Sequence, residues 1–167
     1  MAYTVIPDVR AKLYDTIIPA AIAALPSTVT VSGAAYNLRV PDLYYGLPST
    51  TTPPDSWVGI VGSTTADTPM AVFPATASRP QDEKFDTTLR HWYRVGDTDY
   101  LGQRIATESA YALYRTIFAQ LRVAGIWLGV LTAPYDIYIT NVHDYEWALA
   151  EGRAVGIEVT ITVKSRV

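Results

Sequence analysis

The sequence predicts one α+β domain, residues 1–167, in which two main helices pack on a mainly antiparallel β-sheet. Apolar residues recur at helical spacing in two segments and alternate at strand spacing in two others. The predicted elements follow one another in the order α-β-β-β-α-β-β. This order lacks the regular alternation of strand and helix that is typical of a parallel sheet. A chain of 167 residues also has the usual size of one domain.

The first predicted helix covers residues 7–25. Pro7 suits its first turn, because an N–H at that position has no partner within a helix. Pro19 lies inside the apolar pattern, so we expect a kink or the start of a second short helix there. The apolar stripe of this helix consists of Val9, Leu13, Ile17, Ala20 and Ala24.

The first strand is predicted at residues 28–31, a short β-branched run. Residues 33–80 are then broken repeatedly by proline and predict a loop-rich excursion with one clear strand, at residues 57–62. Tyr44 and Tyr45 lie in its irregular parts. Because disordered linkers are poor in aromatic residues, we interpret the excursion as an ordered interaction loop. A simple surface excursion is the alternative.

A long strand is predicted at residues 84–95, where apolar and polar residues alternate. Trp92 lies on its polar face. His91 lies on the apolar-leaning face, so we expect a hydrogen-bonded core histidine there rather than a ligand. The turn at residues 96–99 supplies N-cap candidates for the next helix. The apolar-leaning face carries Phe85, Thr87, Leu89, His91, Tyr93 and Val95.

The second main helix is predicted at residues 107–123, with Gly125 as its left-handed cap. Tyr111, Tyr114 and Phe118 lie beside its apolar stripe, which gives it a wide apolar arc. This helix therefore needs cover on more than one side, from the sheet and the first helix or from a neighbouring subunit. The stripe itself consists of Ala106, Ala110, Leu113, Ile117 and Leu121.

Two strands are predicted to close the chain. The first is at residues 135–140. The second is at residues 154–166, where the odd positions from Val155 to Val163 are apolar and the even positions are polar. One face therefore belongs to the core and the other contacts water, as in an antiparallel sheet with helices on one side.

The composition indicates a surface that other subunits cover. Charged residues are 17% of the chain against a typical ~25%, while Tyr and Trp, which are enriched at interfaces, are plentiful. A neutral surface rich in Ser and Thr is the alternative. The net charge of −3 argues against broad binding of nucleic acid or anionic membranes. The candidate subunit-interface residues are Tyr44, Tyr45, Trp57, Trp92, Tyr111 and Tyr114.

We find no catalytic, cofactor-binding or metal-binding motif and predict that the chain is not an enzyme. Residues 143–146 group potential ligands, but neighbours on a strand point in different directions and no second cluster completes a coordination shell. Residues 59–62 lack the third glycine and the Lys-Ser/Thr of a phosphate-binding loop. Asp82, Glu83 and Asp86 flank the start of a strand, where we expect a solvated charged cluster rather than acid–base catalysis.

The absence of cysteine excludes disulfides and thiolate metal sites. No stretch approaches the ~20 apolar residues of a membrane-spanning helix, and the first residues lack the features of a signal peptide. We therefore expect the protein to be made and used in the cytoplasm.

Four of the predicted elements form a recognisable pattern of order and length. They are the opening helix at residues 7–25, the long strand at 85–95, the helix at 107–123 and the closing strand at 154–166. This pattern resembles the tail terminator family of long-tailed bacteriophages, also called tail-completion or minor tail protein U-like proteins. The resemblance implies a structural virion protein of the neck, assembled in the host cytoplasm. It implies a homohexameric ring that caps the head-proximal end of the tail tube and stops its polymerisation.

The partners that the resemblance implies are further copies of the chain, the tail tube protein and a head-closure or connector protein. The resemblance also implies that DNA passes through the lumen of the ring without specific binding and that no membrane is involved. A tube grows through an open heterologous contact, so a terminator has to match the growing end with one face and present different chemistry on the other.

Three alternatives remain open from the sequence. The chain could be another neck component, such as a head-closure or connector subunit, although the helix at residues 107–123 fits poorly in the small β-barrel of many head-closure proteins. It could be a non-viral peptide-binding module that uses an exposed strand edge. It could also be an enzyme without a recognisable motif.

Overall fold

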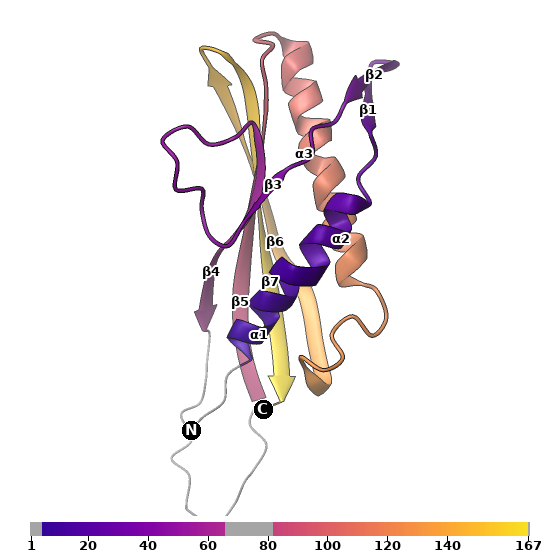
Figure 1. The fold of residues 1–167 in the computed structure, drawn as a ribbon, viewed down its shortest axis with the longest axis vertical. Helices are drawn as coiled ribbons and strands as arrows, with labels where there is room; N and C mark the ends of the chain where they lie inside the picture. Colours follow the sequence, from indigo (N-terminus) through magenta and orange to yellow (C-terminus); the bar gives the residue numbers. More distant parts are fainter. Residues whose placement is uncertain (1–4, 66–81, 167) are drawn as a thin grey trace, which may run out of the picture.

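The computed structural model describes residues 5–65 and 82–166 and has the predicted α+β fold class. The helices lie together on one side of a long twisted sheet (Figure 1). In chain order the elements are α1 (Ile6–Lys12), the π-helical turn η1 (Leu13–Ile17), α2 (Ile18–Ala23), β1 (Thr28–Val31), β2 (Ala34–Asn37), β3 (Asp42–Tyr44), β4 (Ser56–Thr65), β5 (Asp82–Val95), α3 (Tyr100–Leu121), β6 (Thr132–Leu149) and β7 (Gly152–Arg166).

In the excursion at residues 33–80 we predicted one strand, which corresponds to β4. The structure adds two short strands before it, β2 and β3. β2 pairs with β1 through a tight turn in which Ser32 and Gly33 both have positive φ, 52° and 82°. Two such residues form the hairpin turn that matches the twist of antiparallel strands. β3 has 3 residues and no apolar alternation, which explains why its sequence gave no strand signal. Residues 66–80 of the predicted excursion lie outside the described residues.

The opening helix changes phase at Pro19. Proline has no N–H to donate to the preceding turn, and the π-helical turn η1 lies directly before α2, where this bond would form in a regular helix. A π turn inserts one additional residue, which moves the apolar stripe by one position. Ile18 and Ala21 are consequently fully buried. Our prediction of Ala20 and Ala24 as core residues is wrong, since Ala20 is half-buried and Ala24 is exposed.

Within the described residues, the main sheet has five strands in the order β3-β4-β5-β7-β6, and β1 and β2 form a separate hairpin. Neighbouring strands are antiparallel except for the parallel pair β3 and β4. The two edges differ greatly, because β3 has 3 residues and β6 has 18. The strand that we predicted at residues 135–140 is only one part of β6.

The core lies between the sheet and the helices. The odd positions from Phe85 to Tyr93 in β5 and from Val155 to Val163 in β7 are buried there with the predicted stripe of α3, whereas Val95 is only partly buried. The even face of β7, which we predicted to contact water, also buries Ala154 and Thr162. α3 begins at Tyr100, earlier than predicted, and Asp99 is its N-cap, accepting a hydrogen bond of 2.8 Å from the backbone N–H of Gly102. Gly125 has φ of +75° but lies in the turn beyond the helix, whose last residue is Leu121.

Glu83 corrects the prediction of a solvated charged cluster at the start of β5. Its side chain lies on the core side and is 3% exposed. The carboxylate accepts a hydrogen bond of 2.9 Å from the backbone N–H of Val5, the N-cap of α1, where negative charge suits the positive end of the helix. Asp86 lies on the other face and accepts a hydrogen bond from the hydroxyl of Thr162. The side chain of Asp82 lies outside the described residues.

Candidate functional site

The face of the main sheet opposite the core carries no helix in the described part of the chain, and we call it the helix-free face (Figure 1). Residues that pair directly across antiparallel strands project to the same face. Trp57 pairs with Trp92, Trp92 pairs with Gly156, and Gly156 pairs with Tyr145. These four positions therefore form one row across β4, β5, β7 and β6.

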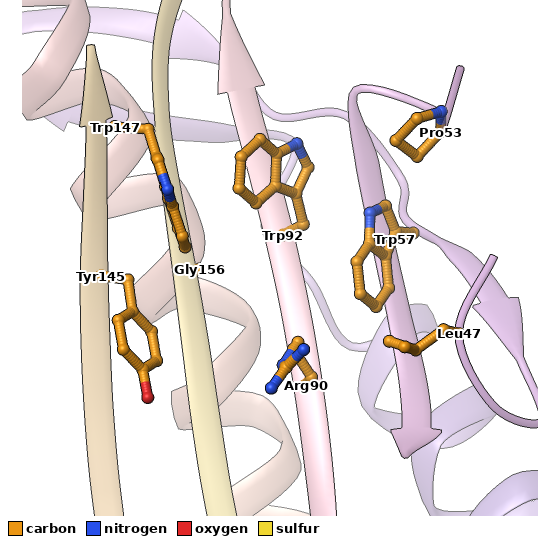
Figure 2. Close-up of a pocket in the computed structure, with 8 residues that line it drawn as sticks. All are labelled: Leu47, Pro53, Trp57, Arg90, Trp92, Tyr145, Trp147 and Gly156. Carbon is orange, nitrogen blue, oxygen red and sulfur yellow. The ribbon is translucent and has the colours of Figure 1, made fainter. Parts of the chain in front are cut away.

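A groove of about 460 Å³ lies along this row. Figure 2 shows the rings of Trp147, Trp92 and Trp57 side by side on neighbouring parts of the sheet, with Leu47 and Pro53 beyond Trp57. We call this feature the aromatic groove. It is lined by Leu47, Pro53, Trp57, Arg90, Trp92, Tyr145, Trp147 and Gly156.

Gly156 allows the aromatic rings to meet across β7. A Cβ atom at this position would lie 2.9 Å from Cζ3 of Trp147, closer than real Cβ atoms come to other atoms. Without it, the Trp147 ring lies 4.8 Å from the ring of Trp92 between centroids. The contacts continue to Tyr145, 5.7 Å from Trp147, and to His143, which stacks on Tyr145 at 4.2 Å. The rings therefore support one another before any partner binds.

Paired charges border the aromatic groove. Arg90 donates hydrogen bonds to Glu158 from Nε at 3.1 Å and from Nη2 at 2.5 Å. Asp55 accepts hydrogen bonds from both Arg94 and Arg39. Because each of these arginines already has a carboxylate partner, the groove favours an uncharged surface over a phosphate or a carboxylate.

Trp57 contributes an unused hydrogen-bond donor. Its side chain is 6% exposed, whereas Tyr145 and Trp147 are 37% and 39% exposed. The indole Nε1 of Trp57 is buried and has no acceptor among the described residues. A buried donor without an acceptor costs about 1–3 kcal/mol. Because this atom is closed off from solvent, a molecule in the groove contacts the ring of Trp57 and not its N–H.

The predicted interface residues separate into three places, and only Trp57 and Trp92 lie together in the aromatic groove. Tyr111 and Tyr114 lie on α3, on the opposite side of the sheet, with their ring centroids 6.1 Å apart. The hydroxyl of Tyr111 donates a hydrogen bond of 3.2 Å to Asp144 of β6. Burial and the Asp144 carboxylate both raise the pKa of Tyr111.

Tyr44 and Tyr45 occupy the third place, at the short edge of the sheet. Tyr44 is the last residue of β3 and is half-buried. Tyr45 is 53% exposed, and its ring contacts Tyr14 edge-to-face at 5.4 Å. The guanidinium of Arg10 lies over the same ring, 4.8 Å from its centroid. Tyr45 thus joins the edge of the sheet to the opening helix.

Trp147, Tyr145 and Gly156 are groove residues that the sequence did not indicate. Tyr145 and Trp147 stand two positions apart, the spacing of residues on one face of a strand. That signal was hidden because we ended the predicted strand at residue 140. Asp144, between His143 and Tyr145, projects to the helix side, so the grouped ligands of residues 143–146 do point in different directions.

His91 is buried in the core, as its position in the strand predicted. The predicted hydrogen bond is not found at Nε2, which has no partner among the described residues. Burial lowers the pKa of His91 to about 3. The imidazole is therefore neutral at physiological pH and contributes to packing.

The ranges 5–65 and 82–166 contain no group of three or more His, Cys, Asp or Glu residues that could hold a metal ion. No helix in these ranges is long and apolar enough to cross a membrane. Neither a comparison with known protein-family models nor a search of curated proteins finds a match to this chain.

Proposed function

We propose that this chain is a structural subunit that assembles with its own copies into a ring, and that the ring is the tail terminator of a long-tailed bacteriophage. The ring caps the head-proximal end of the tail tube, stops its polymerisation and provides the docking surface for the head or neck. The tail tube protein and a head-closure or connector protein are its other partners.

The aromatic groove is the observation that carries the proposal. Trp, Tyr and Arg are the residue types that dominate the binding energy of protein interfaces. Here Trp92, Trp147, Tyr145 and Arg90 gather on an open sheet face, in contact with one another and partly exposed. A face of this composition is suited to burial against another protein surface.

The unlike edges of the sheet support a ring rather than a two-fold dimer. A ring needs a heterologous contact, in which one surface of a subunit meets a different surface of the next. The 3-residue edge β3 and the 18-residue edge β6 provide two such different surfaces on opposite sides of one subunit. A two-fold dimer would instead join identical patches.

The charge of the chain supports a lumen through which DNA slides. The net charge is −3, and Arg39, Arg90 and Arg94 are each paired with a carboxylate. Free cationic side chains along a channel would hold phosphates and slow the passage of DNA. Arginines that are already paired with a carboxylate hold phosphates less strongly.

Sedimentation velocity and mass photometry of the purified chain test the assembly. We expect a hexamer, or a monomer that forms a ring when tail tubes are added. Trp92→Asp places a charge in the aromatic groove and should prevent assembly while the circular dichroism spectrum of the monomer stays unchanged. Tyr100→Asp is the matched control, because Tyr100 is 77% exposed and lies outside the groove. Equal assembly of the two variants would contradict the role of the groove.

Electron microscopy of particles made without this protein tests the position in the virion. The expected products are DNA-filled heads beside separate tails of uncontrolled length. Normal virions in the absence of the protein would show that it is not a terminator, whatever its oligomeric state.

A peptide-binding module is the second candidate function, because β6 offers a long edge at which an extended peptide could add a strand. The two functions differ in one simple property. A peptide-binding module is a stable monomer that ignores tail tubes, whereas a terminator subunit assembles on them.

A further inference from the structure

The chemistry of the aromatic groove selects an extended, uncharged peptide that contains proline. Flat indole rings pack well against proline rings, and grooves lined by aromatic residues bind such peptides in several domain families. The paired state of Arg90 and Glu158 leaves no strong charge for the peptide to match.

We propose that residues 66–81 of one copy, the segment between β4 and β5, dock in the aromatic groove of a neighbouring copy. This docking rests on the self-assembly proposed above and would be the contact between copies that drives the assembly. The partner of the groove is then a segment of the same chain.

The composition of this segment matches the groove. Its charged residues are Asp67 and Arg79, near its two ends, so residues 68–78 are uncharged. Each proline in it keeps a carbonyl but lacks an N–H, which leaves backbone acceptors in excess over donors. The residues that would pack on the indole rings are Pro69, Met70, Val72, Phe73 and Pro74.

The reach of the segment favours a neighbouring copy over its own chain. Trp57 lies eight residues before Thr65, the last residue of β4, which is about 26 Å along a strand. Half of residues 66–81, fully extended, spans about 27 Å. Return to the groove of the same chain would therefore require full extension and leave no residues for reversing direction. The segment can reach the groove of an adjacent copy without reversing its direction.

Docking of this kind is heterologous, because the segment and the groove are different surfaces of the same subunit. Each copy gives one segment and receives one, so the contact continues from copy to copy until the ring closes. The inference thus explains how an open sheet with an exposed aromatic face can assemble without a second protein.

Disulfide trapping tests the proposal with the full chain, which has no cysteine of its own. One variant carries Ala71→Cys in the segment, and a second carries Leu47→Cys at the rim of the groove. The two are mixed and oxidised. We expect a covalent dimer that contains one chain of each variant. The matched control replaces the groove variant by Leu128→Cys, since Leu128 is 73% exposed and lies outside the groove.

Two further substitutions connect the cross-link to the groove. Trp92→Ala in the Leu47→Cys chain should lower the cross-linking rate at least about tenfold, as for a central interface residue. Phe73→Asp in the Ala71→Cys chain should lower it similarly and leaves every groove residue intact. The second variant keeps the test valid if Trp92→Ala fails to fold.

The outcomes separate this inference from the proposed function. A cross-link no faster than in the Leu128→Cys control, in a chain that still sediments as a ring, overturns the docking and leaves the ring. A disulfide formed within one chain carrying both cysteines at high dilution overturns docking between copies. A chain that stays monomeric on tail tubes and does not cross-link overturns both proposals, and the groove then takes a segment of another protein.

Discussion

At the scale of single residues, His91 makes the stability of the fold dependent on pH. Burial holds its pKa at about 3, while the unfolded chain has the ordinary value of 6.5. Between these values the unfolded chain binds a proton that the folded chain does not bind. The free energy of unfolding therefore falls as the pH falls below about 6.5, by up to ~1.4 kcal/mol per pH unit.

Urea denaturation at pH 7 and pH 5 measures this effect. His91→Leu replaces the imidazole with an apolar side chain of similar size that does not titrate. We expect this variant to lose less stability than the unmodified chain when the pH falls from 7 to 5. His143→Gln is the control, because His143 is the other histidine of the chain and is exposed. The same pH dependence in His91→Leu as in the unmodified chain would contradict the assignment.

The sequence identified part of the aromatic groove but could not identify its geometry. Trp92 was placed correctly on the face opposite the core, because strand alternation is a local property of the chain. The contact of Trp147 with Trp92 depends on the register of β5, β7 and β6, which is set by distant parts of the chain. The role of Gly156 follows from that register and has no signal of its own.

At the scale of elements, the N-terminus of α3 depends on Asp99. Its side chain accepts a hydrogen bond from the backbone N–H of Gly102, and this N–H has no partner within the helix. We expect Asp99→Ala to lower the free energy of unfolding by about 1 kcal/mol, and Asp99→Asn to retain most of it. Chemical denaturation measures the difference. Thr98→Ala is the neighbouring control, and an equal loss in that variant would show that the cap is not the cause.

The elements that the sequence predicted well are those with one face in the core. α3, β5 and β7 have strict apolar spacing, and the apolar residues predicted from it are buried except Val95, which is partly buried. The spacing did not predict the burial of Ile105 and Ala112 in α3 or of Ala154 and Thr162 in β7. β6 was mostly missed because its residues from His143 to Ala148 are exposed on both faces, so the alternation of Tyr145 and Trp147 with Asp144 and Glu146 does not mark a core face. At Pro19 the sequence predicted a kink or a second short helix, and α2 does begin there, at Ile18. The phase change that η1 introduces was not predicted, because its size depends on how the helix packs.

At the scale of the whole molecule, the order of the strands was not predictable from the sequence. β7 lies between β5 and β6, although β6 precedes it in the chain. This arrangement places the last strand in the interior of the sheet and moves β6 to the edge. The sequence predicted an antiparallel sheet with helices on one side, and such a sheet permits several strand orders.

The position of β6 at the edge has a measurable consequence for its backbone amides. In an antiparallel pair, alternate residues of an edge strand direct their N–H groups toward the partner and away from it. The outward groups of β6 have no strand to bond in the described part of the chain.

Hydrogen–deuterium exchange followed by NMR should therefore show slow and fast amides in alternation along β6 of the monomer, and uniformly slow amides along β7. Uniformly fast exchange along β6 would mean that this strand is not formed in solution. Loss of the alternation on assembly, with all amides of β6 becoming slow, would reveal that a further strand has joined the sheet at this edge.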